Sequence, residues 1–155
     1  MLTFEITSIT GHDQRHRMRR LKFATGSLTT RECEALMNAL PIEVTFVDRL
    51  DRIKYFNKPK DRIYARDKKL INSRIQKCHT KESLDMVEEL MSKFKSGAKD
   101  MAEFWKKEGE RIRYSRYIAV RDEDGRYLGT LEATQDITEI KKIDGERRTL
   151  VWNES

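Results

Sequence analysis

Two side chains that can bind a metal stand next to each other in the sequence, Cys78 and His79. An imidazole is a good ligand for heme iron, and a thiolate is the alternative. Structural metal sites use about four protein ligands, so a single neighbouring pair is a weak metal signal. We therefore favour an interpretation in which Cys78 fills core space and His79 bonds to the backbone near a helix start that Thr80 caps. Iron ligation by His79 stays open as the alternative.

The basic N-terminal stretch offers two further possibilities. His12 and His16 stand four residues apart and would share one face of a helix, as metal ligands can. Asp13 points elsewhere and no other acidic or thiol group is in register, so we predict no metal site there. Five cationic residues nearby have the charge to contact phosphates: Arg15, Arg17, Arg19, Arg20 and Lys22. They lack interleaved aromatic residues and a helix-turn-helix pattern, so a solvated arm or linker over residues 1–27 is favoured over nucleic-acid binding.

Common catalytic motifs are missing from the sequence: it has no nucleophile elbow, Gly-rich phosphate loop, HExxH or kinase loop. Glu103 and Glu132 fall in predicted strands and resemble a carboxylate pair, but nothing brings a base and a nucleophile together around them. We expect the protein not to be an enzyme.

Composition favours one modest domain, since 155 residues of which 37% are hydrophobic support a single core. No run approaches the ~18 apolar residues of a membrane-spanning helix, and the N-terminus lacks the pattern of a secretory signal. Cys33 and Cys78 are far apart and give no disulfide framework. We expect a soluble, cytoplasmic protein with reduced cysteines and no membrane partner. The net charge of +6 is spread along the chain and identifies no partner.

Periodicity predicts the elements that must position these side chains. Apolar residues at helical spacing indicate helices over 29–40 and 80–96, ended by Pro41 and Gly97, and a terminal helix from residue 139. The apolar stripes are Cys33, Leu36, Met37 and Leu40 in the first helix, Leu84, Val87, Met91 and Phe94 in the second, and Ile140, Ile143 and Leu150 in the last. β-Branched and aromatic segments predict strands over 43–48, 52–57, 101–105, 111–122 and 126–138. This order indicates an α+β fold whose inserted helices cover one face of the sheet.

Four segments together resemble a PAS domain. They are LPIEVTFVDRLDRIKYFN, IQKCH, FKSGAKDMAEFW and RYIAVRDEDGRYLGTLEATQDITEI, within a match that spans residues 28–150. The exit from the last strand, Gly129 to Thr138, is the most specific part. More narrowly, the chain is similar to the PAS-like domain at the C-terminal end of DUF438 proteins. It departs from that type before the long helix, where Cys78-His79 is followed by Thr80-Lys81 and not by two prolines.

The resemblance implies a five-stranded antiparallel sheet with helices on one face, which encloses a hollow. In many relatives this hollow holds a small molecule, heme or flavin, and the role is sensing. It also implies a PAS-like sensor domain over 28–138, with a flanking helix at 29–40 and a helix or tail at 139–155. The expected walls of the hollow are Phe46, Leu84, Val87, Phe104, Tyr114, Ile118 and Leu131, with Cys78 and His79 beside them; alternation leaves open which strand face points inward.

Homodimerisation is expected, because the stripe of the helix over 29–40 can bury against its copy in a second chain. The sequence does not identify the cofactor, and heme or another small molecule is possible; the signalling partner is also unidentified. Two alternatives stay open: a purely structural dimerisation module, and a nucleic-acid-binding regulator that uses the basic arm.

Overall fold

A computed structural model describes residues 19–60 and 62–152 of the chain. It divides into two compact units, Met1–Ala35 and Leu36–Ser155, and the two metal-ligand candidates His12 and His16 lie outside the described residues. Within the described residues, no helix is long and apolar enough to cross a membrane.

The first unit contains a β-hairpin. β1 (Arg20–Phe23) pairs antiparallel with β2 (Gly26–Thr29), and a two-residue turn joins the strands. The expected arm or linker over residues 1–27 therefore contains a hairpin from Arg20 onward, because a two-residue turn suffices to pair the backbone groups of this short segment. α1 (Thr30–Ala39) follows at once. Its start is a capping box: Glu32 Oε2 accepts from Thr29 N at 2.7 Å, and Glu32 N donates to Thr29 Oγ1 at 3.2 Å.

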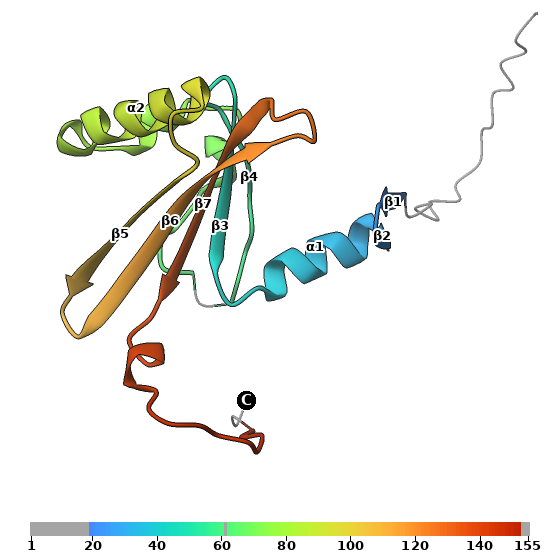
Figure 1. Ribbon diagram of the computed structural model, residues 1–155, viewed down its shortest axis with the longest axis vertical. Coiled ribbons are helices and arrows are strands. Elements are labelled where there is room, and N and C mark those ends of the chain that lie inside the picture. Colours follow the sequence, from blue (N-terminus) through green and yellow to red (C-terminus); the bar gives the residue numbers. More distant parts are fainter. Residues whose placement is uncertain (1–18, 61, 153–155) are drawn as a thin grey trace, which may run out of the picture. The chain divides into compact units, whose positions relative to one another are not determined.

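The second unit is built on one five-stranded sheet, which confirms the predicted fold class. Its strands are β3 (Glu43–Asp48), β4 (Ile53–Phe56), β5 (Met101–Glu108), β6 (Arg111–Arg121) and β7 (Tyr127–Asp136). The order is β4-β3-β7-β6-β5, and every neighbouring pair is antiparallel (Figure 1). The first and last strands of the fold thus lie side by side in its centre, with Val44 opposite Ala133 and Asp48 opposite Gly129.

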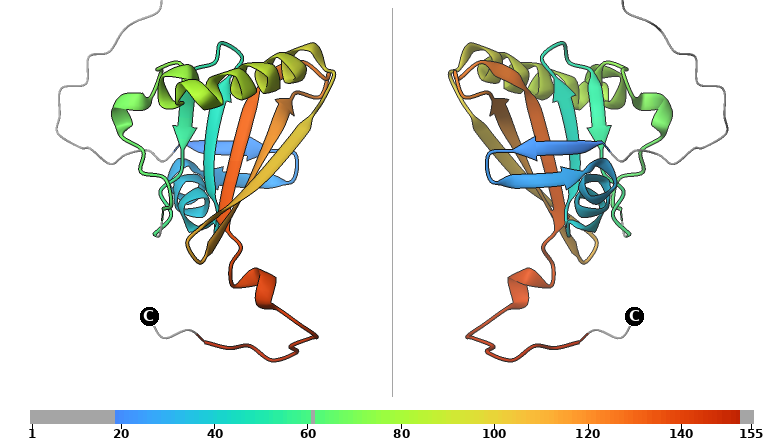
Figure 2. Two further views of the ribbon diagram at one scale, coloured as in Figure 1. Left: turned by 90° about the vertical axis from the view of Figure 1, so that its left-hand side faces the viewer. Right: turned by 90° about the vertical axis from the view of Figure 1, so that its right-hand side faces the viewer.

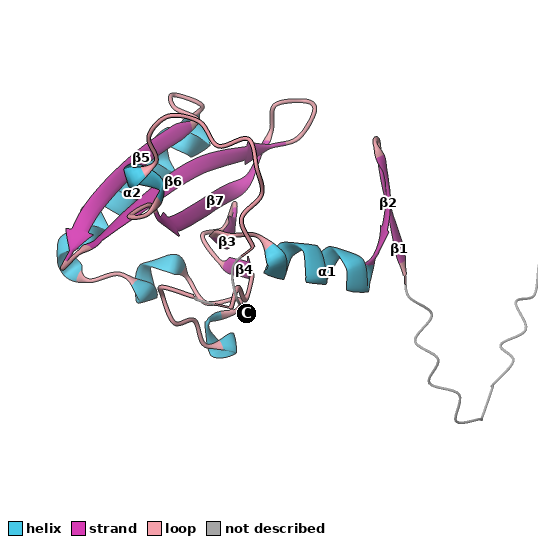
Figure 3. Cartoon of the chain, turned by 90° about the horizontal axis from the view of Figure 1, so that it is seen from below, coloured by secondary structure: helices cyan, strands magenta, loops and turns pink. Residues whose placement is uncertain are grey.

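Helical segments cover one face of this sheet. α2 (Lys81–Ser96) lies across the strands (Figure 2), and it ends at Gly97, whose left-handed backbone caps the helix. Figure 3 shows α2 on one side of the strands. Two short 3₁₀ turns between β4 and α2, η1 (Lys68–Leu70) and η2 (Ile75–Cys78), pack into the same core as Met91 of α2. The core forms where these segments meet the sheet, and its buried residues are Val47, Ile53, Phe56, Ile75 and Met91.

The predicted terminal helix is wrong in length. Beyond β7 the described chain contains one 3₁₀ turn, η3 (Ile140–Lys142), and no further regular structure up to residue 152. Ile143 and Leu150 are 74% and 82% exposed, so the expected apolar stripe buries nothing. A short helix without a surface to pack against is marginal in water, which explains why the pattern does not produce one.

Candidate functional site

Register places four side chains from three strands on the face of the sheet that α2 covers. Thr130 and Glu132 are two residues apart in β7, so both point to this face. Tyr117 of β6 stands directly opposite Glu132. Phe104 of β5 stacks on Tyr117, with ring centroids 6.1 Å apart and planes inclined by 16°. Thr130 contacts α2 through its hydroxyl, which donates to Met91 Sδ at 3.4 Å. These residues form the floor of a hollow between sheet and helix.

The apolar part of the hollow has a volume of about 350 Å³. Its roof is one face of α2. The side chains that line it are Ser83, Met86, Val87, Leu90 and Met91 from the helix, Val47, Phe104, Lys106, Tyr117, Thr130 and Glu132 from the sheet, and Ile75 and His79 from η2 and the residue after it. The helical spacing of Val87, Leu90 and Met91 turns these three side chains toward the strands. The hollow is thus a largely apolar space with a few polar groups at one end.

A second, more polar cavity of about 550 Å³ adjoins the first. The two share six lining residues: His79, Ser83, Phe104, Lys106, Tyr117 and Glu132. The remaining wall of the polar cavity comes mainly from the segment after β4, with Ile63, Tyr64, Ala65 and Arg66, and from Cys78 and Thr80 beside α2. The shared residues make one hollow with an apolar and a polar compartment.

An ion pair stands at the boundary of the two compartments. Arg66 Nη2 lies 3.0 Å from Glu132 Oε2, and the two side chains are only 12% and 16% exposed. The Tyr117 hydroxyl donates to the other carboxylate oxygen, Oε1, at 3.2 Å. Burial and the adjacent Glu132 charge raise the pKa of Tyr117, so its hydroxyl keeps its proton and remains a donor. Glu132 therefore links a strand residue to a residue of the loop that closes the polar compartment.

A second cation at the hollow, Lys106, is also paired. Its ammonium group forms an ion pair with Glu108 on the same strand and lies 6.0 Å from the centroid of the Tyr64 ring. The hydrogen bond to Glu108 raises the pKa of Lys106, so the side chain is charged at neutral pH. Both cations that line the hollow thus have a carboxylate partner within the chain.

His79 lies at the boundary, directly after η2. Its Nδ1 is 3.4 Å from the Ser83 hydroxyl, and its backbone N–H donates to Gln76 O. Burial lowers the pKa of His79 below its ordinary value of 6.5, so the imidazole is neutral at pH 7. Thr80 occupies the N-cap position of α2, although its side chain makes no capping hydrogen bond.

Cys78 lines the polar cavity and packs against the buried core cluster. In the described part of the chain, no group of three or more His, Cys, Asp or Glu residues is arranged to hold a metal ion.

The structure sorts the predicted walls of the hollow into two sets. Val87, Phe104, Cys78 and His79 line it, whereas Leu84 is not among the lining residues. The assignment of Phe46, Tyr114, Ile118 and Leu131 is wrong, because these four side chains lie on the opposite face of the sheet. Phe46 and Ile118 both pair with Leu131, which alternates with the inward-facing Thr130 and Glu132. Glu103 also lies on that outer face and accepts a hydrogen bond from the Tyr114 hydroxyl, so it is separated from Glu132 by the sheet.

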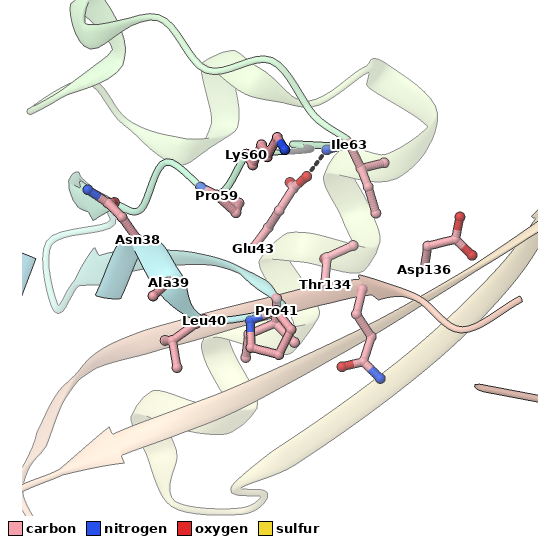
Figure 4. Close-up of a pocket in the computed structure, with 12 residues that line it drawn as sticks. Asn38, Ala39, Leu40, Pro41, Glu43, Pro59, Lys60, Ile63, Thr134 and Asp136 are labelled. Atoms are coloured by element: carbon pink, nitrogen blue, oxygen red, sulfur yellow. Dashed lines mark hydrogen bonds between the residues drawn. The ribbon is translucent and has the colours of Figure 1, made fainter. Parts of the chain in front are cut away.

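A third cavity, of about 440 Å³, lies at the other end of β3 and β7 (Figure 4). Glu43 lines it and accepts hydrogen bonds from the backbone N–H groups of Ile63 and Tyr64. Burial raises the pKa of Glu43 despite these donors and the nearby guanidinium of Arg62, 3.8 Å away. Glu43 thus fixes the loop that carries Arg66 to the start of β3.

Two of the three comparisons with known proteins found matches. A family model described as PAS domain matches residues 33–138. The crystal structure of the C-terminal domain of a protein from Streptococcus mutans matches with a TM-score of 0.77 and 28% identity, over 83% of this chain and 99% of that one. The PAS domain of a protein from Colwellia psychrerythraea matches with a TM-score of 0.52 and 17% identity, over 70% of this chain and 97% of that one. The comparison with curated proteins found no match.

Proposed function

The chain belongs to the PAS domain family, and we propose that it acts as a sensory domain that holds a small molecule in the hollow between α2 and the sheet. The observation that carries this proposal is the composition of the hollow. A mainly apolar space of about 350 Å³ adjoins a compartment where Glu132, Tyr117 and His79 converge. Small-molecule sites are commonly apolar clefts of roughly 300–1,000 Å³ with a few convergent polar groups.

The strand order supports transmission of a signal from this hollow. β7 carries Thr130 and Glu132 in the floor and continues directly into the segment beyond Asp136. β7 also pairs along its length with β3, which follows α1. A ligand that contacts the floor therefore acts on the strand that continues into the C-terminal segment and pairs with the strand that follows α1. If the flanking segments have two packing arrangements, the ligand shifts the equilibrium between them. The free energy of this shift equals at most the difference between its binding free energies for the two arrangements.

Heme is the alternative occupant. His79 lines the hollow and its imidazole is neutral, which is the form that binds iron. Bound heme would supply gas or redox sensitivity, and His79 would hold it. The visible absorption spectrum of freshly purified protein separates this alternative from a colourless ligand. An intense heme band that the His79→Ala variant loses would identify heme, and a colourless preparation would remove it as a tightly retained cofactor.

Native mass spectrometry of freshly purified protein tests the proposal itself. We expect a bound small molecule, or stabilisation by one from a library, and we expect Val87→Trp to abolish both by filling the apolar compartment. Glu103→Gln is the matched control, because Glu103 lies on the opposite face of the sheet. Binding that Val87→Trp leaves intact would place the ligand elsewhere and contradict the proposal.

Homodimerisation is a second part of the proposal, and one observation favours it. No residue of α1 is buried, and Leu36, in the centre of its apolar stripe, is 52% exposed. An amphipathic helix normally buries such a stripe against another surface. A second copy of the chain would supply that surface.

A further inference from the structure

The charges at the hollow are already balanced within the chain. Glu132 pairs with Arg66, and Lys106 pairs with Glu108. His79, the remaining ionisable imidazole in the lining, is desolvated and neutral at pH 7. No other Asp, Glu, Lys or Arg lines the two compartments in the described part of the chain.

This balance determines which ligands can enter. A charged group that leaves water for an apolar cavity pays a large desolvation penalty unless an opposite charge compensates it. Arg66 contacts Glu132 through Nη2, and its buried Nε–H has no partner in the described part of the chain. A ligand carboxylate could reach this N–H, but the one guanidinium would then face two buried carboxylates, and one negative charge would stay uncompensated. An amine beside Glu132 would leave one positive charge uncompensated in the same way.

Hydrogen-bonding capacity remains at the boundary. Across the described residues, His79 Nε2 makes no hydrogen bond to the protein, while Nδ1 lies near Ser83. The Tyr117 oxygen donates to Glu132 and can still accept a hydrogen bond. A hydroxyl or amide on a ligand can therefore bond here without an ionic charge, while its apolar part contacts Val87 and Phe104.

We propose that the ligand of this hollow is an electrically neutral molecule with an apolar body and one hydroxyl, carbonyl or amide group. The apolar body lies under α2, and the polar group lies between His79 and Tyr117. The Arg66–Glu132 pair acts as the specificity determinant that rejects carboxylates and amines. This inference rests on the proposed function, because it concerns the ligand of the same hollow.

Three probes of one shape test it on the full chain: 4-phenylbutanol, 4-phenylbutyrate and 4-phenylbutylamine at pH 7.5. We expect the alcohol to bind at least about tenfold more tightly than either ion in calorimetry, since both ions would be buried without compensation. Equal or tighter binding of the acid or the amine would overturn the inference. This comparison uses the unaltered protein, so it does not depend on how a variant folds.

Two variants then reverse the selectivity. Glu132→Gln leaves Arg66 without its carboxylate, so the variant should gain affinity for 4-phenylbutyrate relative to the alcohol. Arg66→Gln leaves Glu132 without its cation and should favour 4-phenylbutylamine. Folding of each variant is checked by circular dichroism. If both variants fold and keep the selectivity of the unaltered protein, the pair does not determine specificity and the inference is wrong.

The outcomes separate this inference from the proposed function. If all three probes bind with equal affinity and Val87→Trp abolishes this binding, the hollow is supported as a ligand site, but the inference that its ligand is neutral is wrong. Binding that survives Val87→Trp, or no binding of any probe, would count against the hollow as a ligand site and therefore against both proposals.

Discussion

Gly129 of β7 lies directly against the ring of Phe46 on the neighbouring strand. A Cβ added to Gly129 would stand 2.7 Å from the ring atom Cζ of Phe46 and 2.2 Å from the carbonyl oxygen of Val47. Both distances are far shorter than a van der Waals contact, and the backbone oxygen cannot rotate away as a side chain can. The central pairing of β3 with β7 therefore depends on a glycine at this position.

Gly129→Ala should destabilise the protein by about 2–4 kcal/mol, because the added methyl group forces the two central strands apart. Urea denaturation followed by circular dichroism measures this change. Gly109→Ala is the control: nothing lies within 4 Å of its Cβ position, and its φ of +59° makes the substitution cost only about 1–2 kcal/mol. Equal losses in both variants would contradict the steric explanation.

Breaking the ion pair between Arg66 and Glu132 should be costly. Glu132→Ala leaves the largely buried guanidinium without its partner, and we expect a loss of about 3 kcal/mol. Arg66→Ala should cost a similar amount, and the double variant should cost clearly less than the sum of the two. A double-mutant cycle by chemical denaturation measures this coupling. Additive losses would show that the pair contributes no mutual stabilisation.

His79 should make stability depend on pH. Its pKa is lowered in the folded protein, so between that value and 6.5 the unfolded chain binds a proton that the folded chain does not. The free energy of unfolding should therefore fall as the pH drops through 6.5 toward the lowered folded-state pKa. His79→Gln removes this contribution, so the variant should lose less stability over the same interval. A slope identical to that of the unaltered protein would contradict the assignment.

Asn57 should be hard to replace. It is fully buried; its amide nitrogen donates to Met37 O and Ile42 O at 2.9 Å each, and its oxygen accepts from Val44 N at 2.8 Å. Asn57→Leu leaves these three backbone groups without their partner, which should cost about 3 kcal/mol or more. Thermal denaturation measures the loss. Asn72→Leu is a comparison at a residue whose side chain bonds at the surface to Lys54 Nζ. The left-handed backbone of Asn72 (φ +66°) adds a cost of about 1–2 kcal/mol for leucine, so this variant should still lose less than Asn57→Leu.

Leu36→Asp tests the dimer. If α1 associates with its copy through its apolar stripe, a charge in the centre of that stripe should convert dimer to monomer in analytical ultracentrifugation. Ligand binding in the hollow should persist, because Leu36 does not line it. Glu34→Asp is a control that keeps the charge of α1. A dimer of unchanged affinity in Leu36→Asp would show that the stripe is not the interface.

Local patterns in the sequence were enough to predict the main elements. Helical spacing identified α2 because Val87, Met91 and Phe94 must all bury on one face, and β-branched runs identified the five strands. The strand exit from Gly129 to Thr138 identified the family. The five-stranded antiparallel sheet that the resemblance implies is confirmed, and β3 pairs with β7 within it.

Only the tertiary structure showed which side chains line the hollow and how their charges are paired. Strand β3 carries apolar residues on both faces, so alternation could not tell that Val47 points toward α2 and Phe46 away from it. Arg66 lies in a charged segment without periodicity, and no local signal predicts a partner that is 66 residues away in sequence. An ion pair of this kind forms only when the loop closes over the sheet. The sequence therefore determined the helices α1 and α2 and the five strands of the sheet, whereas the inward face and the charge balance of the hollow followed from their packing.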